Sequence, residues 1–342
     1  MGVAYKKLED QLVLTHSMHG KVEDLPQVFA KMSSVAGTAA NGPPVVVLHF
    51  PLTDKDGRTM DVCIPLSENV ENTEFETMTL TGGIAATTIH RGSYSTIMDT
   101  YRELISKVYK HGHPIQENGR EEFQNLDLEH PEKTVVEIQS MLIDWEGKLK
   151  SHLGRVLGSE TRDHVLSGFD ELTLETEQLK RASIIKDALC KLDEVATEEQ
   201  KYEALSCCGH EFPAELIEDM KILYRKTNSI DTIIQAMKDG HYFYPHLRRE
   251  GNILYDRKAP ARQESFDKAQ TRVDKLRAIC FCPLLNDVWD EMPGTFCYCA
   301  AGWSRRLFEG ILDIKLKVDV VKSLTKGDDY CEFAIHLPEN IT

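Results

Sequence analysis

The stretch of sequence that decides the fold is residues 84–112, which read IAATTIHRGSYSTIMDTYRELISKVYKHG. Its first seven residues are mostly apolar or β-branched and predict a strand that ends at His90. Ser93 can then cap a helix, and Gly112 can end it. Between these two residues, apolar side chains recur at helical spacing, at Ile97, Met98, Tyr101, Leu104, Ile105 and Val108. The stretch therefore predicts a strand followed by an amphipathic helix.

A second copy of this pattern comes earlier in the chain. Apolar residues over 25–35 have helical spacing, and Pro43-Pro44 separates them from a following strand. The strands that we predict outside the opening stretch are 45–50, 59–66, 75–80 and 133–141. The order over residues 21–141 is thus helix, strand, strand, then strand, strand, helix, strand. The two halves look like diverged copies of one small α/β unit.

The rest of the chain changes character twice. Residues 144–280 are charged and mostly helical in pattern, with amphipathic segments at 179–192, 213–223, 231–240 and 261–279, and with an aromatic, packed loop at 240–260. The last segment predicts a strand at 295–299, a helix around Trp303, and a hairpin of strands 316–324 and 330–337. We therefore expect three parts: residues 1–145, a helical region at 146–279, and a cysteine-rich α/β unit at 280–342 that packs with the helical region.

Composition limits the classes of function. The 342 residues carry a formal charge of -15, which disfavours nucleic acid as a partner because binding phosphates requires clustered Lys and Arg. There is no run of 18 apolar residues and no apolar signal-peptide core near the N-terminus, so we expect neither a membrane partner nor export. Nine cysteines without an export signal indicate a reducing compartment, and we predict a cytoplasmic protein.

Several short motifs of the first 145 residues resemble the gyrase-inhibitor-like (GyrI-like) effector-binding family. They are IHRGSY at 89–94, NGREEF at 118–123 and VVEI at 135–138, together with DVCIPL at 61–66. In that family two α/β units pair around an aromatic-lined cleft that takes small organic ligands, often cations, with a buried Glu. The resemblance implies an α+β fold with duplicated units and an antiparallel sheet around a cleft, followed here by the helical region and a C-terminal β-α-β-β unit.

The resemblance also implies candidate site residues. A carboxylate between aromatic faces offers charge pairing and cation–π attraction together. Glu137, Glu121 and Glu122 are the candidates for the buried acid, and His90 and Tyr94 would lie near the mouth of the cleft. Each has a structural alternative: a strand Glu usually faces water, a Tyr on the helix stripe is often core, and His90 can be a satisfied strand-end histidine.

Transcription regulators of this family carry a helix-turn-helix module beside the pocket. In this sequence only about twenty residues precede the first predicted helix, too few for such a module. The interpretation that we favour is a stand-alone sensor or sequestering protein for an aromatic or cationic small molecule, without a DNA-binding domain. Its oligomeric state is left open.

The C-terminal cysteines are a second feature with possible chemistry. Cys280 and Cys282 form one Cys-x-Cys pair, and Cys297 and Cys299 form another. In extended backbone, residues i and i+2 share a face, and Pro283 favours an extended Cys282. Four converging thiolates would suit zinc, with Cys331 a fifth candidate. The alternatives are reduced thiols in a core or pocket, which we favour, and a redox-active or nucleophilic thiol.

The stretch GDDYCEF, residues 327–333, resembles the ending of vinyl-reductase-type ligand sensors and of the aminothiazoline-carboxylate hydrolase family. In the sensors the cysteine that matches Cys331 joins a zinc site with a second cysteine eight positions earlier. Ser323 occupies that position here, so the zinc site cannot be carried over intact. This resemblance and the ring-opening relatives of the GyrI-like family make a hydrolase of small heterocyclic or strained-ring compounds the alternative function, and a zinc-dependent structural protein a third.

Overall fold

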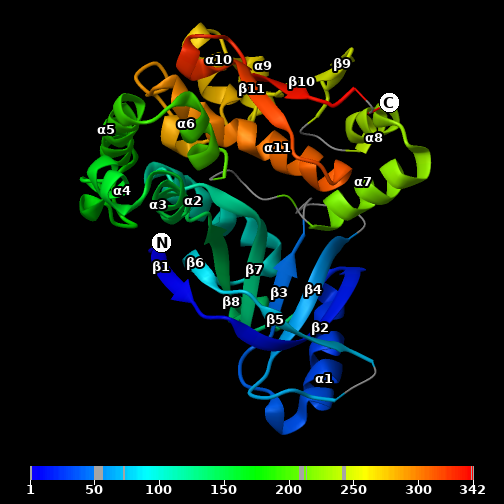
Figure 1. Ribbon diagram of the computed structural model, residues 1–342. Coiled ribbons are helices and arrows are strands. Elements are labelled where there is room, and N and C mark those ends of the chain that lie inside the picture. The colour runs from blue at the N-terminus through cyan, green and yellow to red at the C-terminus, as the bar shows by residue number, and fades with distance from the viewer. Residues whose placement is uncertain are drawn as a thin grey trace. The chain divides into compact units, whose positions relative to one another are not determined.

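The computed structural model describes residues 2–49, 57–71, 74–207, 212, 214–240, 244–339 and 341. Some residues with a sequence prediction lie outside the described residues. They are Phe50 of the predicted strand 45–50, the predicted turn at 54–56, and residues Cys208, His210 and Pro213. The chain divides into two compact units, Met1–Ile143 and Asp144–Thr342, each of which is described by itself (Figure 1).

The first unit is an eight-stranded antiparallel sheet with two helices. Its elements are β1 (Ala4–Leu8), β2 (Gln11–Gly20), α1 (Leu25–Ala36), β3 (Val45–Leu48), β4 (Arg58–Pro65), β5 (Glu76–Leu80), β6 (Gly83–Arg91), α2 (Ile97–Lys110), β7 (Ile115–Asn125) and β8 (Val135–Leu142). The strand order is β1-β6-β8-β7-β3-β4-β2-β5. Each half thus has the order strand, strand, helix, strand, strand, and the halves meet where β3 pairs with β7. The predicted α+β class with duplicated units is confirmed.

The sequence analysis missed three strands, β1, β2 and β7. In β1 (AYKKL) and β7 (IQENGREEFQN) the side chains are largely polar or charged, so neither strand has a clean apolar alternation. These strands form because each of them pairs with neighbours that do carry a strong signal, β6 for β1 and β3 and β8 for β7. Tertiary pairing therefore overrides weak local propensity here.

A long bent ribbon joins the two halves. Residues 4–8 pair with residues 83–87 and residues 11–15 pair with residues 76–80, in the same antiparallel register on both sides of the unpaired residues between them. The ribbon bends where Asp10 accepts a hydrogen bond from the backbone amide of Gly82, at 2.7 Å. β1 and β5 are the two edge strands of the sheet, yet β1 continues into β2, next to β5, and β5 continues into β6, next to β1. The sheet therefore has to curl, as Figure 1 shows.

Gly82 is required at this bend, and we expect Gly82→Ala to destabilise the first unit by about 1–3 kcal/mol. A Cβ on Gly82 would lie 2.2 Å from the carbonyl oxygen of Leu8, which is backbone and cannot move aside cheaply. Chemical unfolding followed by circular dichroism measures the change. Gly2→Ala is the matched control, because a Cβ at Gly2 meets nothing within 4 Å. Equal unfolding midpoints for the two variants would contradict this account of the bend.

The second unit contains nine α-helices among its described residues. They are α3 (Trp145–Leu157), α4 (Ser159–Val165), α5 (Gln178–Val195), α6 (Glu198–Leu205), α7 (Ala214–Thr227), α8 (Ile230–Gly240), α9 (Gln263–Lys268), α10 (Arg272–Ile279) and α11 (Tyr298–Leu312). The single helix predicted over 261–279 is wrong, because the chain leaves helical geometry at Ala269 and restarts at Thr271, whose side chain caps α10. Leu179 was predicted on the buried face of α5, but it is 61% exposed.

A four-stranded antiparallel sheet completes this unit, in the order β11 (Lys317–Lys322), β12 (Glu332–His336), β10 (Ile253–Arg257) and β9 (Arg248–Glu250). Part of the predicted loop over 240–260 is therefore β9 and β10. The strand predicted at 295–299 is wrong: Gly294–Cys297 is a 3-10 turn that runs into α11. Within residues 280–342 the order is therefore α11, β11, β12, and the strand that pairs with β12 on its other side is β10, which precedes α9 and α10.

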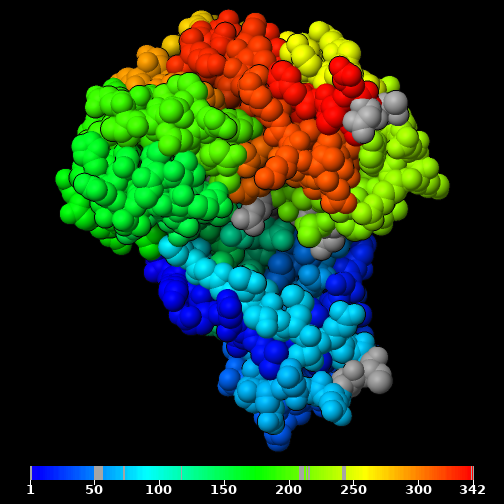
Figure 2. All heavy atoms as spheres, in the orientation of Figure 1, coloured from blue at the N-terminus to red at the C-terminus, as the bar shows by residue number. Residues whose placement is uncertain are grey.

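One core joins the helical region to the C-terminal segment. Residues of α8, such as Ile233 and Met237, belong to the same buried cluster as Phe308 of α11 and Phe333 of β12. Helix α11 also contacts α6 and α7, and the orange and green surfaces meet in the space-filling view (Figure 2).

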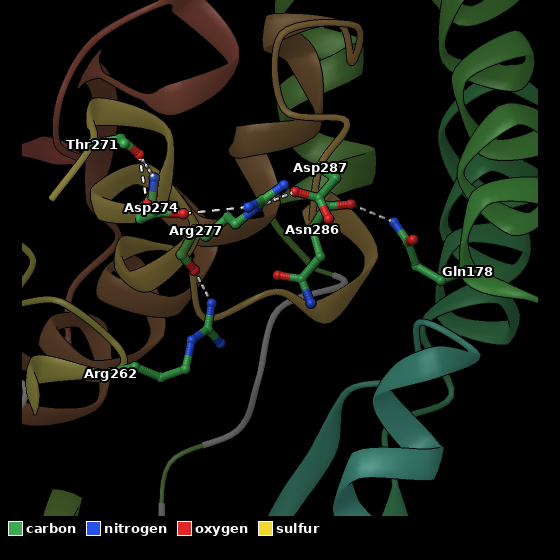
Figure 3. Close-up of polar contacts among 7 residues, drawn as sticks. All are labelled: Gln178, Arg262, Thr271, Asp274, Arg277, Asn286 and Asp287. Carbon is green, nitrogen blue, oxygen red and sulfur yellow. Dashed lines mark hydrogen bonds and ion pairs between the residues drawn. The ribbon is translucent and has the colours of Figure 1, made fainter. Parts of the chain in front are cut away.

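A polar network fastens α10 to the loop that follows it (Figure 3). Arg277 on α10 bonds Asp274 within its helix and Asp287 in the loop, and its backbone carbonyl accepts from Arg262. From α5, Gln178 donates to the carbonyls of Leu284 and Asn286, at 2.6 and 2.9 Å. These contacts hold the segment after Cys280 against two helices.

Candidate functional site

A fully buried carboxylate lies at the centre of the first unit. Glu121 is 0% exposed, and both of its oxygens accept hydrogen bonds from phenols. The hydroxyl of Tyr94 donates to Oε2 at 2.6 Å, and the hydroxyl of Tyr101 donates to Oε1 at 3.1 Å. Of the five candidates from the sequence, the structure brings Glu121 and Tyr94 together.

The fold explains why these side chains meet. Glu121 is on β7, where it lies opposite Val46 of β3 on one side and Ile138 of β8 on the other. Cross-strand partners share a face of a sheet, and here that is the face on which α2 lies. Tyr101 points to this face from α2, and Tyr94 reaches it from the 3-10 turn Tyr94–Thr96 that precedes the helix.

Aromatic rings surround the acid and come from both halves of the domain. The ring of Phe123, two residues after Glu121 on the same strand face, stacks on Tyr94 with centroids 6.0 Å apart. Phe29 of α1 lies against Phe123, with centroids 5.3 Å apart. Arg58 of β4 donates to the hydroxyl of Tyr94 at 3.2 Å, with its guanidinium 5.8 Å from the centre of that ring. The site is therefore built where the two copies meet.

Burial dominates the electrostatics of the site. It raises the pKa of Glu121 above the ordinary value of 4.5, while the bonds from Tyr94 and Tyr101 and the charge of Arg58 act in the opposite direction. Burial and the nearby Glu121 raise the pKa of both tyrosines well above 10.0. Both phenols therefore stay neutral donors at physiological pH.

Both ring nitrogens of His90 are hydrogen-bonded within the protein. Its Nε2 donates to the carbonyl of Ser93 at 3.0 Å, and its Nδ1 bonds the hydroxyl of Thr100 at 2.8 Å. The ring is 3% exposed. His90 thus ties the end of β6 to α2 and helps to hold the turn that carries Tyr94.

Glu122 and Glu137 lie on the opposite face of the sheet from Glu121. They are cross-strand partners, and successive residues of β7 alternate between faces. Lys6 pairs with Glu137 at 2.7 Å, and Gln139 donates to both carboxylates. Burial and the neighbouring Glu137 raise the pKa of Glu122. The structure therefore separates these two acids from the aromatic residues around Glu121.

Four residues of the site were not among the candidates: Phe29, Arg58, Tyr101 and Phe123. Tyr101 had been interpreted as core, which its 3% exposure agrees with, although its hydroxyl also reaches Glu121. Phe123 shares a strand face with Glu121, two residues earlier, but this follows only once residues 115–125 are known to form a strand. Phe29 and Arg58 come from the other half, and only the sheet order places them here.

The five candidate cysteines of the second unit are buried or partly buried thiols. All five candidates are free. Burial raises the pKa of Cys282 to about 12 and of Cys299 to about 11, and it raises that of Cys280, Cys297 and Cys331 as well. Cys297 and Cys299 do not share an extended face as predicted, because Cys297 caps α11 and Cys299 is in its first turn.

No group of three or more His, Cys, Asp or Glu side chains is arranged to hold a metal ion in the part of the chain that the structure describes. Zinc at the five cysteines stays a prediction from the sequence. Within the same described residues, no helix has the length and apolar character needed to cross a bilayer.

The curled antiparallel sheet of two strand-strand-helix-strand-strand halves, with an acid enclosed by aromatic side chains, fits a small-molecule binding domain of the effector-binding class. Residues 1–142 match the family described as GyrI-like small molecule binding domain, and the first unit is a domain of this family. Residues 270–342 match a family of unknown function, DUF6144. No curated protein matches the chain.

Several solved structures are similar to the first unit. The EcmrR C-terminal domain is 15% identical, with 41% of this chain and 96% of that chain covered and a TM-score of 0.37. SAV2435 bound to tetraphenylphosphonium is 14% identical, with coverage of 43% and 97% and a TM-score of 0.30. A hydrolase from Listeria innocua is 13% identical, with coverage of 41% and 91% and a TM-score of 0.31.

Proposed function

We propose that the first unit binds an aromatic or cationic organic molecule at Glu121, with Tyr94, Tyr101, Phe29 and Phe123 as the ligand-facing aromatic residues. The observation that carries the proposal is a fully buried carboxylate whose two partners are neutral phenols. A buried carboxylate without a full cationic partner is costly, and a ligand cation would relieve that cost. The aromatic faces add cation–π attraction in a desolvated environment.

Access to Glu121 requires one side chain to move. Tyr94 is half-buried and belongs to a short 3-10 turn, whereas Tyr101 is fixed on α2 at 3% exposure. Rotation of the Tyr94 phenol away from Glu121 would break one hydrogen bond to the acid and the bond from Arg58. The ligand would then take the place of the phenol beside the carboxylate, while Tyr101 keeps its bond.

Calorimetric titration of the whole chain with tetraphenylphosphonium tests the proposal, since this probe is both a cation and aromatic on every side. Triphenylphosphine oxide, which is neutral and carries three phenyl groups on the same tetrahedral phosphorus, is the matched ligand control. Saturable binding of the cation with at least tenfold weaker binding of the neutral compound is expected. No binding of either compound at millimolar concentration would refute the site.

The affinity for a permanent cation should rise with pH. Of the groups that face the ligand position beside the Arg58 guanidinium, Tyr94 and Tyr101 stay neutral, so Glu121 is the one that titrates. Its pKa is raised, so the site gains its negative charge only as the pH rises through a value above 4.5. Below that pKa the affinity should rise by up to about tenfold per pH unit, then level off.

The same titration has a consequence for the ligand-free protein. The native state binds the Glu121 proton more tightly than the unfolded chain does, so this group contributes less stability as the pH rises from 4.5 through the raised pKa. Titrations at a series of pH values, on the unmodified chain and on Glu121→Gln, measure both effects. A pH-independent affinity in the unmodified chain would contradict the assignment of Glu121.

We infer that the protein acts as a sensor or sequestering module rather than by binding DNA directly. The net charge of -15 opposes association with a phosphate backbone. Hydrolysis stays the alternative prediction from the sequence. A general base has to reach a water molecule. Both oxygens of Glu121 already accept hydrogen bonds from phenols, so the geometry favours binding over hydrolysis.

A further inference from the structure

The second unit contains a buried ion pair that the proposed function does not use. Lys258 follows β10 and is 8% exposed, and its Nζ lies 2.5 Å from Oδ2 of Asp256, which is 0% exposed. Lysine and aspartate are rarely buried so completely. A buried ion pair is often no more stabilising than apolar residues of the same volume, so stability alone does not explain it.

The surroundings of the lysine are aromatic. Its Nζ lies 3.8 Å from the centre of the Trp303 ring, 4.9 Å from that of Tyr244 and 5.7 Å from that of Phe333. Trp303 is itself stacked on Phe212, with centroids 4.7 Å apart. The amine is therefore held in a desolvated box with one carboxylate as its charged neighbour.

The carboxylate is only partly satisfied. Oδ2 of Asp256 accepts from both Lys258 and the hydroxyl of Ser304, the latter at 2.8 Å. Oδ1 is buried and has no hydrogen-bond partner among the described residues. An orphaned carboxylate oxygen in a core is costly, and it is suited to accept a hydrogen bond from a ligand.

A pocket opens beside this cluster. It has a volume of about 430 Å³, and its lining includes Ala259 and Pro245, which directly follow Lys258 and Tyr244 in sequence. Its other lining residues are Lys238, Asp239, Gly240, His246 and Gln263. The pocket is large enough to admit a molecule of a few heavy atoms, and Ala259 places its lining one residue away in sequence from Lys258.

The electrostatics make this amine easier to deprotonate than an exposed lysine. Burial lowers the pKa of Lys258, with the Asp256 charge acting in the opposite direction. A neutral amine in an apolar pocket is the nucleophile that forms imines with carbonyl compounds.

We propose that Asp256, Lys258 and Ser304 form a second small-molecule site, at which Lys258 forms an imine with a small aldehyde or ketone. Asp256 takes the proton of the lysine, and Ser304 holds Asp256 in position. The unpartnered Oδ1 would accept a hydrogen bond from a hydroxyl on the carbon next to the carbonyl. The ligand class is therefore a small α-hydroxy carbonyl compound. This site is independent of the function proposed for the first unit.

Imine formation at this site requires only Lys258, Asp256 and the carbonyl compound. The lone pair of Lys258 Nζ attacks the carbonyl carbon, and the carbon–oxygen π bond breaks as the carbon–nitrogen bond forms. The carbonyl oxygen takes the proton held by Asp256. A second proton passes from nitrogen to this oxygen through Asp256, and water leaves as the carbon–nitrogen double bond forms.

Reductive trapping on the folded, full-length chain tests the proposal. The protein is incubated at pH 7 with glycolaldehyde and sodium cyanoborohydride, and the rate of alkylation at each lysine is read by peptide mass spectrometry. Lys268, with a side chain 74% exposed, is the internal reference. We expect Lys258 to react at least tenfold faster than Lys268, and faster with glycolaldehyde than with acetaldehyde. A Lys258 rate equal to or below that of Lys268 would overturn the proposal.

The role of the carboxylate is tested with Asp256→Asn, for which Asp274→Asn on α10 is the matched control. Asp256→Asn should slow alkylation at Lys258 at least tenfold and leave Lys268 unchanged, whereas the control should change neither rate. An unchanged rate at Lys258 would overturn Asp256 as the proton acceptor. If Asp256→Asn does not fold, the comparison of lysines in the unmodified chain still decides whether Lys258 is the reactive amine.

Discussion

Glu121→Gln is expected to weaken the binding of tetraphenylphosphonium by about 10- to 100-fold. The substitution keeps the shape and an acceptor for the Tyr101 hydroxyl, but it removes the negative charge that the aromatic residues of the site enclose. Loss of a charge contact in a desolvated site costs about 1.5–3 kcal/mol, which corresponds to this range. Calorimetric titration at a pH on the plateau of the affinity–pH curve, where the carboxylate is ionised, measures the difference.

Glu122→Gln is the matched control for this experiment. It changes the same side chain one residue away on the same strand, but on the opposite face of the sheet, where Glu122 is the cross-strand partner of Glu137. We expect an affinity within about twofold of the unmodified chain. If both variants bind equally weakly, the effect is one of net charge and the Glu121 site is wrong.

Asp256→Ala is expected to destabilise the second unit by about 3–5 kcal/mol. The substitution leaves Lys258 buried against Trp303 with no carboxylate partner, and an uncompensated buried charge is among the costliest defects in a protein core. The three tryptophans, Trp145, Trp289 and Trp303, all belong to this unit. Urea unfolding followed by tryptophan fluorescence therefore reports on this unit.

The double variant Asp256→Ala/Lys258→Met separates the cost of an unpaired charge from the loss of packing. Methionine fills much of the volume of the lysine stem without the charge, so the double variant should recover most of the stability. A double variant as unstable as Asp256→Ala alone would show that the pair acts through packing and that the charge argument is wrong.

The duplicated fold of the first unit could be predicted because its helices and central strands carry strong periodic patterns. The stripe that ends at Val108 is buried as predicted, with Ile97, Tyr101 and Leu104. The strands β1 and β7 could not be predicted, because their polar side chains are accommodated by specific partners: Lys6 pairs with Glu137, and the tyrosines enclose Glu121. A sequence pattern records polarity but not these partners.

The choice among the three acids shows the same limit. In the sequence Glu137 lies in the more apolar strand, yet in the structure it pairs with Lys6. Glu121 has charged neighbours on both sides in the sequence, yet it is the acid that is fully buried among aromatic residues. Only the register decides between them, since a shift of one residue would exchange the faces of Glu121 and Glu122. The prediction that Cys297 and Cys299 share a strand face is wrong for a related reason, because these residues lie at the start of a helix and not in a strand.

The bent ribbon of the first unit makes the two halves exchange strands. The leading strand of the first half, β1, pairs with β6 of the second, and the leading strand of the second half, β5, pairs with β2 of the first. This is the connectivity of a swapped dimer whose subunits have been fused into one polypeptide. Neither half has a complete set of strand partners within its own sequence, so the domain has to fold as one cooperative piece, and the interface that encloses Glu121 forms only when both halves are in place.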